Sequence, residues 1–221
     1  MTSVRDENAG PARAVTASAE EAVETPLYGL VLAGGKSTRM GRPKWALEYH
    51  GEPHAVVLYR LASSFCQRTF LSIRPEQAEE PALARLPHIA DRFPGMGPLG
   101  GILSAMSEYP KAAWLVLACD LPFVEASTVQ TLLDKRLPRR HATSFMSPHD
   151  GLPEPLCAIY EPSSRLRLIE GVDLGYRCPR KMLMNSSIQL VESARPEELT
   201  NANNPHEFEQ AVARLRAGGE H

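Results

Sequence analysis

The sequence contains no apolar run near the roughly 18 residues that a membrane-spanning helix needs. It also lacks a surplus of positive charge: the formal net charge is −2, whereas proteins that bind nucleic acid generally carry a basic face. The first residues show neither the basic region nor the apolar core of a secretory signal peptide. We therefore expect no membrane and no nucleic acid among the partners of this chain.

Cysteine is scarce as well. The four cysteines form no C-x-x-C pair and their spacing fits no zinc module, which argues against a zinc finger or zinc ribbon. Cys66, Cys119 and Cys157 lie in apolar segments, where a free cysteine behaves as a small hydrophobic residue. Reduced thiols are typical of the cytoplasm, so we expect a cytoplasmic protein.

Two parts of the chain differ in composition. Residues 1–25 are rich in Ala, Glu, Thr and Ser and have no apolar periodicity, which predicts a disordered N-terminal tail. Residues 26–217 have the length and the apolar content of one substantial domain. We therefore expect a single folded domain that follows a tail.

Short apolar runs alternate with segments of helical spacing along this domain. Strands are expected at residues 27–33, 68–73, 86–91, 112–120, 141–147, 154–160 and 187–192, and helices at residues 53–66, 100–108, 127–135, 162–171 and 205–216. The alternation predicts a three-layer, doubly wound α/β fold with a mostly parallel, Rossmann-like sheet. Ligands of such folds bind beyond the carboxyl ends of the strands. Residues 34–44, 91–101 and 119–123 follow expected strands and are therefore candidate site segments.

The first of these segments begins with two adjacent glycines, Gly34 and Gly35. It is not a phosphate-binding P-loop, because the first glycine of that motif would have to stand at Leu30, inside the strand. Adjacent glycines nevertheless let the backbone adopt positive φ, approach a ligand closely and present N–H groups to an anion. Arg39 and Lys44 add two cations that suit phosphate. The segment thus predicts a phosphate site, with a surface loop of incidental charges as the alternative.

The other two segments each carry an aspartate. Asp120 follows the most apolar strand, and a carboxylate there suits Mg²⁺, which binds one or two carboxylates together with substrate phosphates. The alternative for Asp120 is a structural carboxylate satisfied by loop amides. Four histidines are expected to be ordinary loop or surface residues: His50, His54, His88 and His149.

The glycine segment, LAGGKSTRMGRPK, resembles the signature L-A-G-G-x-S-x-R-M-G-x-x-K of the molybdenum cofactor guanylyltransferase family. The resemblance extends over residues 27–216 and is densest before Phe123. It implies a nucleotidyltransferase domain at residues 26–217, in which Arg39 and Lys44 act as catalytic residues by neutralising phosphate charge. It also implies that the loop binds the nucleotide through Leu32, Ala33, Gly34, Gly35 and Lys44.

Three further segments resemble this family. DRFPGMGPLGGI is similar to D-x-x-P-G-x-G-P-L-x-G-I, which implies that Asp91 binds the base or ribose, although aspartate also caps turns readily. ACDLPF is similar to the metal motif C-D-x-P-F, which implies that Asp120 is catalytic and binds both Mg²⁺ and the nucleotide. NANNP is similar to N-x-N-T-P, with Asn204 in place of threonine, which implies that Asn201 and Asn203 bind the acceptor. Alternatively, one of these asparagines caps the last helix.

The resemblance implies a reaction in which GTP is the substrate, Mg²⁺ the cofactor and a molybdopterin-type phosphate the acceptor. Transfer of GMP then gives the guanine dinucleotide cofactor and pyrophosphate. The family also implies transient contact with proteins that mature molybdoenzymes. Two alternatives stay open: the same chemistry with CTP or a sugar-phosphate acceptor, and a non-catalytic module that binds a nucleotide or cofactor.

Two segments bear on substrate recognition. Residues 72–77 lack the asparagine with which many guanylyltransferases contact the base, so the group that reads the base is not identified. Arg180 and Lys181 lie in an expected loop, where they either hold the acceptor's phosphate or form a solvated basic turn.

Overall fold

The computed structural model describes residues 25–35 and 40–218. The predicted tail therefore lies almost entirely outside the described residues, and so does Arg39. The described residues form one seven-stranded sheet with the order β3-β2-β1-β4-β6-β5-β7. The strands are β1 Leu27–Leu32, β2 Arg68–Ile73, β3 His88–Ala90, β4 Ala113–Ala118, β5 Ala142–Met146, β6 Pro153–Tyr160 and β7 Ile188–Val191.

The sheet is mostly parallel, and one strand runs against the others. β1 pairs in parallel with β2 and with β4, β2 with β3, and β5 with β7. β6 is antiparallel to both β4 and β5. The carboxyl ends of β1, β2, β3 and β4 therefore meet at one edge of the sheet, where the predicted site segments begin.

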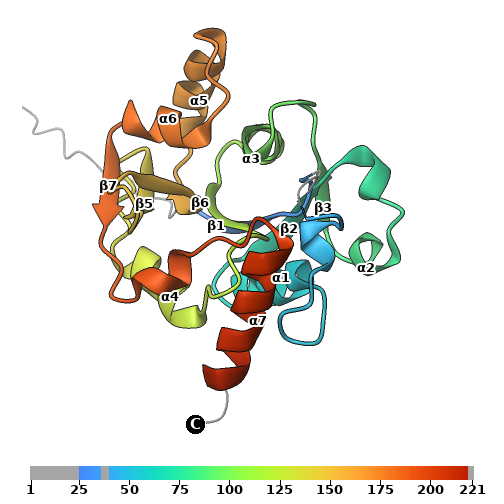
Figure 1. The fold of residues 1–221 in the computed structure, drawn as a ribbon. Helices are drawn as coiled ribbons and strands as arrows, with labels where there is room; N and C mark the ends of the chain where they lie inside the picture. Colours follow the sequence, from blue (N-terminus) through green and yellow to red (C-terminus); the bar gives the residue numbers. More distant parts are fainter. Residues whose placement is uncertain (1–24, 36–39, 219–221) are drawn as a thin grey trace, which may run out of the picture.

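Helices cover both faces of this sheet (Figure 1). They are α1 His54–Ser63, α2 Pro81–Ala84, α3 Pro98–Glu108, α4 Ala126–Asp134, α5 Ser164–Asp173, α6 Pro179–Met184 and α7 Pro205–Gly218, with short 3₁₀ turns at η1 Lys44–Ala46, η2 Pro75–Gln77 and η3 Pro196–Leu199. None of the helices within the described ranges combines the length and the apolar character that crossing a membrane requires.

Two hydrophobic clusters explain this layering. Successive side chains of a strand point to opposite faces, so Val31 joins one cluster and its neighbour Leu30 the other. The first cluster contains side chains of α1 and α4, and the second contains side chains of α3, α5 and α6. The three-layer, doubly wound architecture predicted from the sequence is confirmed.

A third, smaller cluster lies outside the sheet layers. It joins Met40, Leu47 and Tyr49 to Ala202 and to Ala211 of α7. The last helix thereby packs against the segment that carries Lys44. This packing brings two regions that are far apart in the sequence to the same edge of the sheet.

The structure corrects the prediction for residues 178–187, which were expected to form a loop. Six of these residues form α6. Pro179 suits the first position of a helix, and Met182 and Leu183 bury their side chains in the core. A helix of one and a half turns is too short to show apolar periodicity, so it is stabilised by packing rather than by sequence pattern.

Candidate active site

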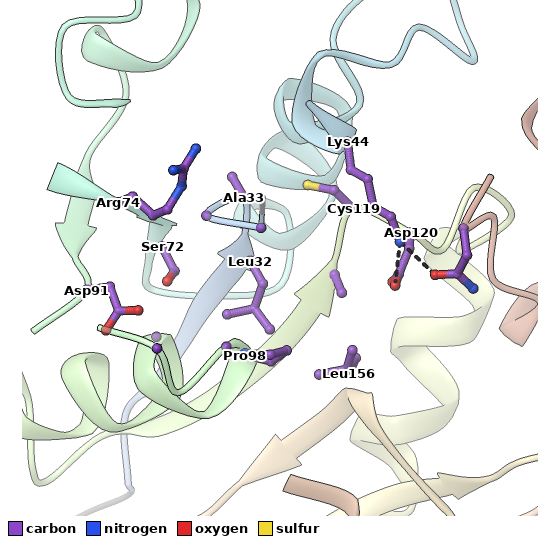
Figure 2. Close-up of a pocket in the computed structure, with 17 residues that line it drawn as sticks. Leu32, Ala33, Lys44, Ser72, Arg74, Asp91, Pro98, Cys119, Asp120 and Leu156 are labelled. Atoms are coloured by element: carbon purple, nitrogen blue, oxygen red, sulfur yellow. Dashed lines mark hydrogen bonds and ion pairs between the residues drawn. The ribbon is translucent and has the colours of Figure 1, made fainter. Parts of the chain in front are cut away.

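A cavity of about 800 Å³ opens at the carboxyl ends of β1, β2 and β4, and its volume is typical of a small-molecule site. Eight residues predicted for the site line it: Leu32, Ala33, Gly34, Gly35, Lys44, Asp91, Asp120 and Asn203. Figure 2 shows the end of β1 between two groups of polar side chains. Ser72, Arg74 and Asp91 lie on one side, and Lys44 and Asp120 on the other.

The backbone at the end of β1 is open to this cavity. Ala33 N–H donates to the Ser72 carbonyl at 2.9 Å, which extends the pairing with β2 by one residue. A Cβ built on Gly35 would meet nothing within 4 Å, so this backbone is accessible to a ligand. The expected positive φ occurs at Gly41, with φ of 72°, and not at Gly34 or Gly35. The two adjacent glycines therefore provide close approach rather than an unusual backbone conformation.

The side chain of Lys44 contacts both Asp120 and Asn203. Its ammonium group lies 3.3 Å from Asp120 Oδ2 and donates a hydrogen bond to Asn203 Oδ1 at 2.7 Å; both contacts are dashed in Figure 2. The side chains of Lys44 and Asp120 are 21% and 15% exposed, so solvent screens this ion pair only in part. A cation and a carboxylate thus face one cavity at close range.

Asp120 has one oxygen in that ion pair and one that is free. Its Oδ1 is buried and has no hydrogen-bond partner among the described residues. The main chain, in contrast, is held, because Ala202 N–H donates to the Asp120 carbonyl at 2.8 Å. A buried anionic oxygen without a partner is unfavourable unless something binds it. A cation is the ligand that fits this oxygen.

Asp91 combines the two roles considered for it. Its Oδ1 accepts a hydrogen bond from Phe93 N–H at 2.8 Å, which makes it a turn cap, and it also lines the cavity. Burial raises the pKa of Asp91, while hydrogen bonds from Phe93 and Ser104 act in the opposite direction. Among the described residues, the main-chain hydrogen bond to this carboxylate is made at Oδ1, so capping leaves Oδ2 for contact with a ligand.

The asparagines near the C-terminus separate in space. Asn203 lines the main cavity, whereas Asn201 lines a smaller cavity of about 60 Å³ together with Phe123 and Arg214. Asn204 caps α7, because its Oδ1 accepts a hydrogen bond from Glu207 N–H at 3.0 Å. Asn201 and Asn203, which the resemblance predicted to bind the acceptor, therefore lie in different surroundings, and Asn204, at the position of the family's threonine, caps a helix.

Besides residues of the glycine segment, DRFPGMGPLGGI, ACDLPF and NANNP, three residues that were not predicted for the site line the cavity. Ser72 and Arg74 stand at the carboxyl end of β2, where the strand rule points to ligand contacts even without the family's asparagine. Leu156 belongs to β6, whose sequence carries no motif. Arg180 is not among the lining residues: it pairs with Asp150 at 2.9 Å and with Glu154 at 3.1 Å.

The prediction for His54 is wrong. Its side chain is buried, with 1% exposed, and it packs beneath the turn that follows Asp120. The segment around it has helical spacing, but the residue that it contacts, Leu121, is 67 positions away. A sequence pattern that extends over one helix does not contain this information.

Comparisons with known proteins agree with this geometry. A family model for the MobA-like NTP transferase domain matches residues 29–215. A molybdenum cofactor biosynthesis bifunctional protein of Synechocystis sp. is 37% identical over 187 residues, which are 85% of this chain and 54% of that protein. This chain thus spans about half the length of that relative. A probable molybdenum cofactor guanylyltransferase of Nostoc sp. is 32% identical over 190 residues, covering 82% of this chain and 88% of the relative.

A solved structure gives the same architecture. The molybdopterin-guanine dinucleotide biosynthesis protein A from Archaeoglobus fulgidus matches with a TM-score of 0.72. The match covers 86% of this chain and 99% of that one at 22% identity, which shows a shared fold. Together with the family model and the sequence relatives, the cavity at the carboxyl ends of the strands leads to one conclusion: the chain belongs to the MobA-like NTP transferase family and is a nucleotidyltransferase.

Proposed function

We propose that this protein is a Mg²⁺-dependent guanylyltransferase that transfers GMP from GTP to the phosphate of a molybdopterin-type acceptor. The observation that carries the proposal is the free, buried Oδ1 of Asp120 beside the ammonium group of Lys44 in one cavity. The names of the relatives from Synechocystis and Nostoc support molybdenum cofactor chemistry and guanylyl transfer. The four free cysteines agree with a reaction in the cytoplasm.

The reaction needs little covalent help from the protein. A phosphate oxygen of the acceptor attacks the α-phosphorus of GTP, a new P–O bond forms, and the bond from the α-phosphorus to the β-phosphate oxygen breaks. Pyrophosphate leaves with the electron pair of that bond. The nucleophile is already an anion, so no general base is required. The work of the protein is to position two anions and to balance their charge.

Five of the lining residues have a place in this scheme. The backbone of Gly34 and Gly35, which lines the cavity, approaches the triphosphate, and the Lys44 ammonium balances the charge that develops on the leaving pyrophosphate. Asp91 contacts the nucleoside, and Asn203 holds Lys44 beside the acceptor. Arg39, outside the described residues, remains a predicted phosphate ligand.

Mg²⁺ fits the free oxygen of Asp120, since this ion prefers carboxylate oxygen and fills its other positions with water and substrate phosphates. Bound there, it would supply charge neutralisation on the phosphate oxygens. The part of the chain that the structure describes contains no group of three or more His, Cys, Asp or Glu side chains able to hold a metal ion. Asp120 is the residue that would hold the ion, and the charge of the ion would act on the phosphates of a bound substrate.

Thermal unfolding with GTP, CTP, ATP or UTP, each with and without Mg²⁺, tests the proposal. A nucleotide at about 100 times its Kd stabilises a protein by about 2.7 kcal/mol, which corresponds to roughly 5–11 °C in Tm for a chain of this size. We expect such a shift for GTP with Mg²⁺. In Asp120→Asn, the part of the Tm shift that depends on Mg²⁺ should be lost. In Asp173→Asn, a change at an exposed position of α5, the whole Tm shift should remain.

A direct assay completes the test. With a molybdopterin-type acceptor, GTP and Mg²⁺, the wild type should release one pyrophosphate for each dinucleotide formed. A preference for CTP would support nucleotidyl transfer but would contradict the assignment of guanine as the base. If no nucleotide raises the Tm of the wild type, with or without Mg²⁺, the proposed function is wrong.

A further inference from the structure

His54 is a buried histidine with no role in the scheme above. It begins α1, and its Nε2 lies 3.1 Å from the carbonyl oxygen of Leu121, the residue after Asp120. A carbonyl oxygen only accepts hydrogen bonds, so Nε2–H is the donor. Burial lowers the pKa of His54 to about 4, so the imidazole is neutral at physiological pH. Its one ring proton is therefore used in this bond.

The bond belongs to a pair that holds the turn after β4. Ala202 N–H donates to the carbonyl of Asp120 at 2.8 Å, and His54 donates to the next carbonyl, that of Leu121. The two donors come from different elements, one from α1 and one from the segment before α7. Peptide groups are planar and rigid, so fixing two successive carbonyls limits the directions in which the Asp120 side chain can point.

Aromatic contacts hold the imidazole in turn. The Tyr49 ring meets it edge-to-face, with centroids 4.8 Å apart, and the Phe208 ring of α7 lies 4.9 Å from that of Tyr49. Tyr49 follows Lys44 by five positions in the same segment. The imidazole of α1 thus contacts the segment that carries Lys44 and the turn that carries Asp120, and Tyr49 connects it to α7.

The choice of histidine at this position needs an explanation. Its Nδ1 is buried without a hydrogen-bond partner among the described residues, and leaving a buried polar atom unsatisfied is unfavourable. Phenylalanine would fill similar space between Tyr49 and the turn without that cost. What phenylalanine lacks is the N–H donor to Leu121, so this bond is the distinctive contribution of His54.

We propose that His54 is a positioning residue for the nucleotidyl transfer: by holding the Leu121 carbonyl, it keeps the Asp120 carboxylate directed at the place where the cation binds. The inference rests on the proposed function, because that function gives Asp120 its task. Groups that orient a metal ligand in this way affect metal affinity or activity by about 10- to 100-fold.

The test compares variants at one position. His54→Phe keeps a ring and removes the donor, whereas His54→Gln keeps an N–H donor at similar reach. The readout is the Mg²⁺ concentration that gives half of the GTP-dependent rise in Tm, followed by kcat with a molybdopterin-type acceptor. We expect His54→Phe to need about tenfold more Mg²⁺. Binding of GTP without Mg²⁺ should be unchanged, and His54→Gln should restore most of the loss.

A matched control is His88→Phe. His88 is exposed and also contacts a main-chain carbonyl, that of Leu86, at 3.1 Å. This variant should respond to Mg²⁺ like the wild type. If His54→Phe does not fold, His54→Met provides a second variant without a donor, to be compared with His54→Gln.

The outcomes separate the two proposals. A wild type without any Mg²⁺-dependent nucleotide response overturns the proposed function, and this inference with it. A responsive wild type together with an unchanged Mg²⁺ requirement in folded His54→Phe or His54→Met overturns the inference alone. An equal loss in His54→Gln also overturns it, because the donor would then not be the group that matters.

Discussion

Gly101 allows α3 to lie directly against the floor of the cavity. A Cβ built on it would overlap Ser72 Oγ and would lie 3.1 Å from Leu32 Cδ2 and 3.2 Å from Ser72 Cβ. Ser72 is buried on β2, with 4% exposed, and Leu32 ends β1. Gly101→Ala must therefore displace groups that line the proposed nucleotide site.

The magnitude follows from two opposing effects. An extra methyl group in a packed interior lowers the free energy of unfolding by about 1–3 kcal/mol. Gly101 lies inside α3, where replacing glycine by alanine stabilises the helix by up to about 1 kcal/mol. We expect a net loss of up to about 2 kcal/mol, or a Tm lower by up to roughly 8 °C for a chain of this size. Displacement of Ser72 into the cavity should also weaken nucleotide binding.

A double-mutant cycle tests the cause. Ser72→Ala removes the overlapping Oγ, so Ser72→Ala with Gly101→Ala should be more stable than the sum of the single changes predicts. Gly171→Ala is the matched control, because the three atoms nearest to its new Cβ, at 3.0–3.3 Å, all belong to the flexible side chain of Met182. The reasoning is refuted if Gly101→Ala melts at or above the Gly171→Ala temperature, or if the cycle shows no coupling.

Three other predictions concern the rest of the molecule. Arg136→Met should cost about 3–5 kcal/mol in urea titration, because it leaves the buried Glu161 carboxylate unpaired, whereas Arg167→Met at an exposed pair should stay within about 0.5 kcal/mol. Burial lowers the pKa of His54 from 6.5 to about 4, so its stabilising contribution is complete above pH 6.5 and is lost as the pH falls towards 4. Between pH 7 and 4 the wild type should lose about 3 kcal/mol more than His54→Gln. A thiol reagent should modify Cys178 of the native protein first, as mass spectrometry of peptides will show, because the other three cysteines are buried or half-buried.

The sequence predicts the strands of this fold well where a buried strand is a continuous apolar run. β4 is such a run, with all six residues buried, and its side chains contribute to the hydrophobic clusters on both faces of the sheet. The position of Asp120 follows from it, since this residue comes shortly after β4, and Lys44 is identified by the glycine segment that follows β1. Local pattern and tertiary structure agree at these places, which is why short motifs identify them.

Other parts of the site depend on contacts that no local pattern contains. Leu156 reaches the cavity because β6 is antiparallel, so that its early residues lie beside the last residues of β4, with Cys157 opposite Leu117. Asn201 and Asn203 are two positions apart, yet they face different cavities. Whether two strands pair in parallel or antiparallel, and which way a loop side chain points, depends on contacts between residues that are far apart in the sequence.

The hydrogen bond from Lys44 to Asn203 joins residues 159 positions apart. At about 5–20 residues per second, a ribosome needs roughly 8–30 s to synthesise the chain between them. The glycine segment is made at the start of that interval and Asp120 about midway through it. The oxygen that accepts the hydrogen bond from the Lys44 ammonium is made only at its end, and the helix that packs on the Lys44 segment after it. The last residues of the candidate site are therefore added late in the synthesis of the chain. A chain that ends before Asn203 lacks the oxygen that accepts this hydrogen bond, and a chain that ends before α7 lacks the helix that packs against the Lys44 segment.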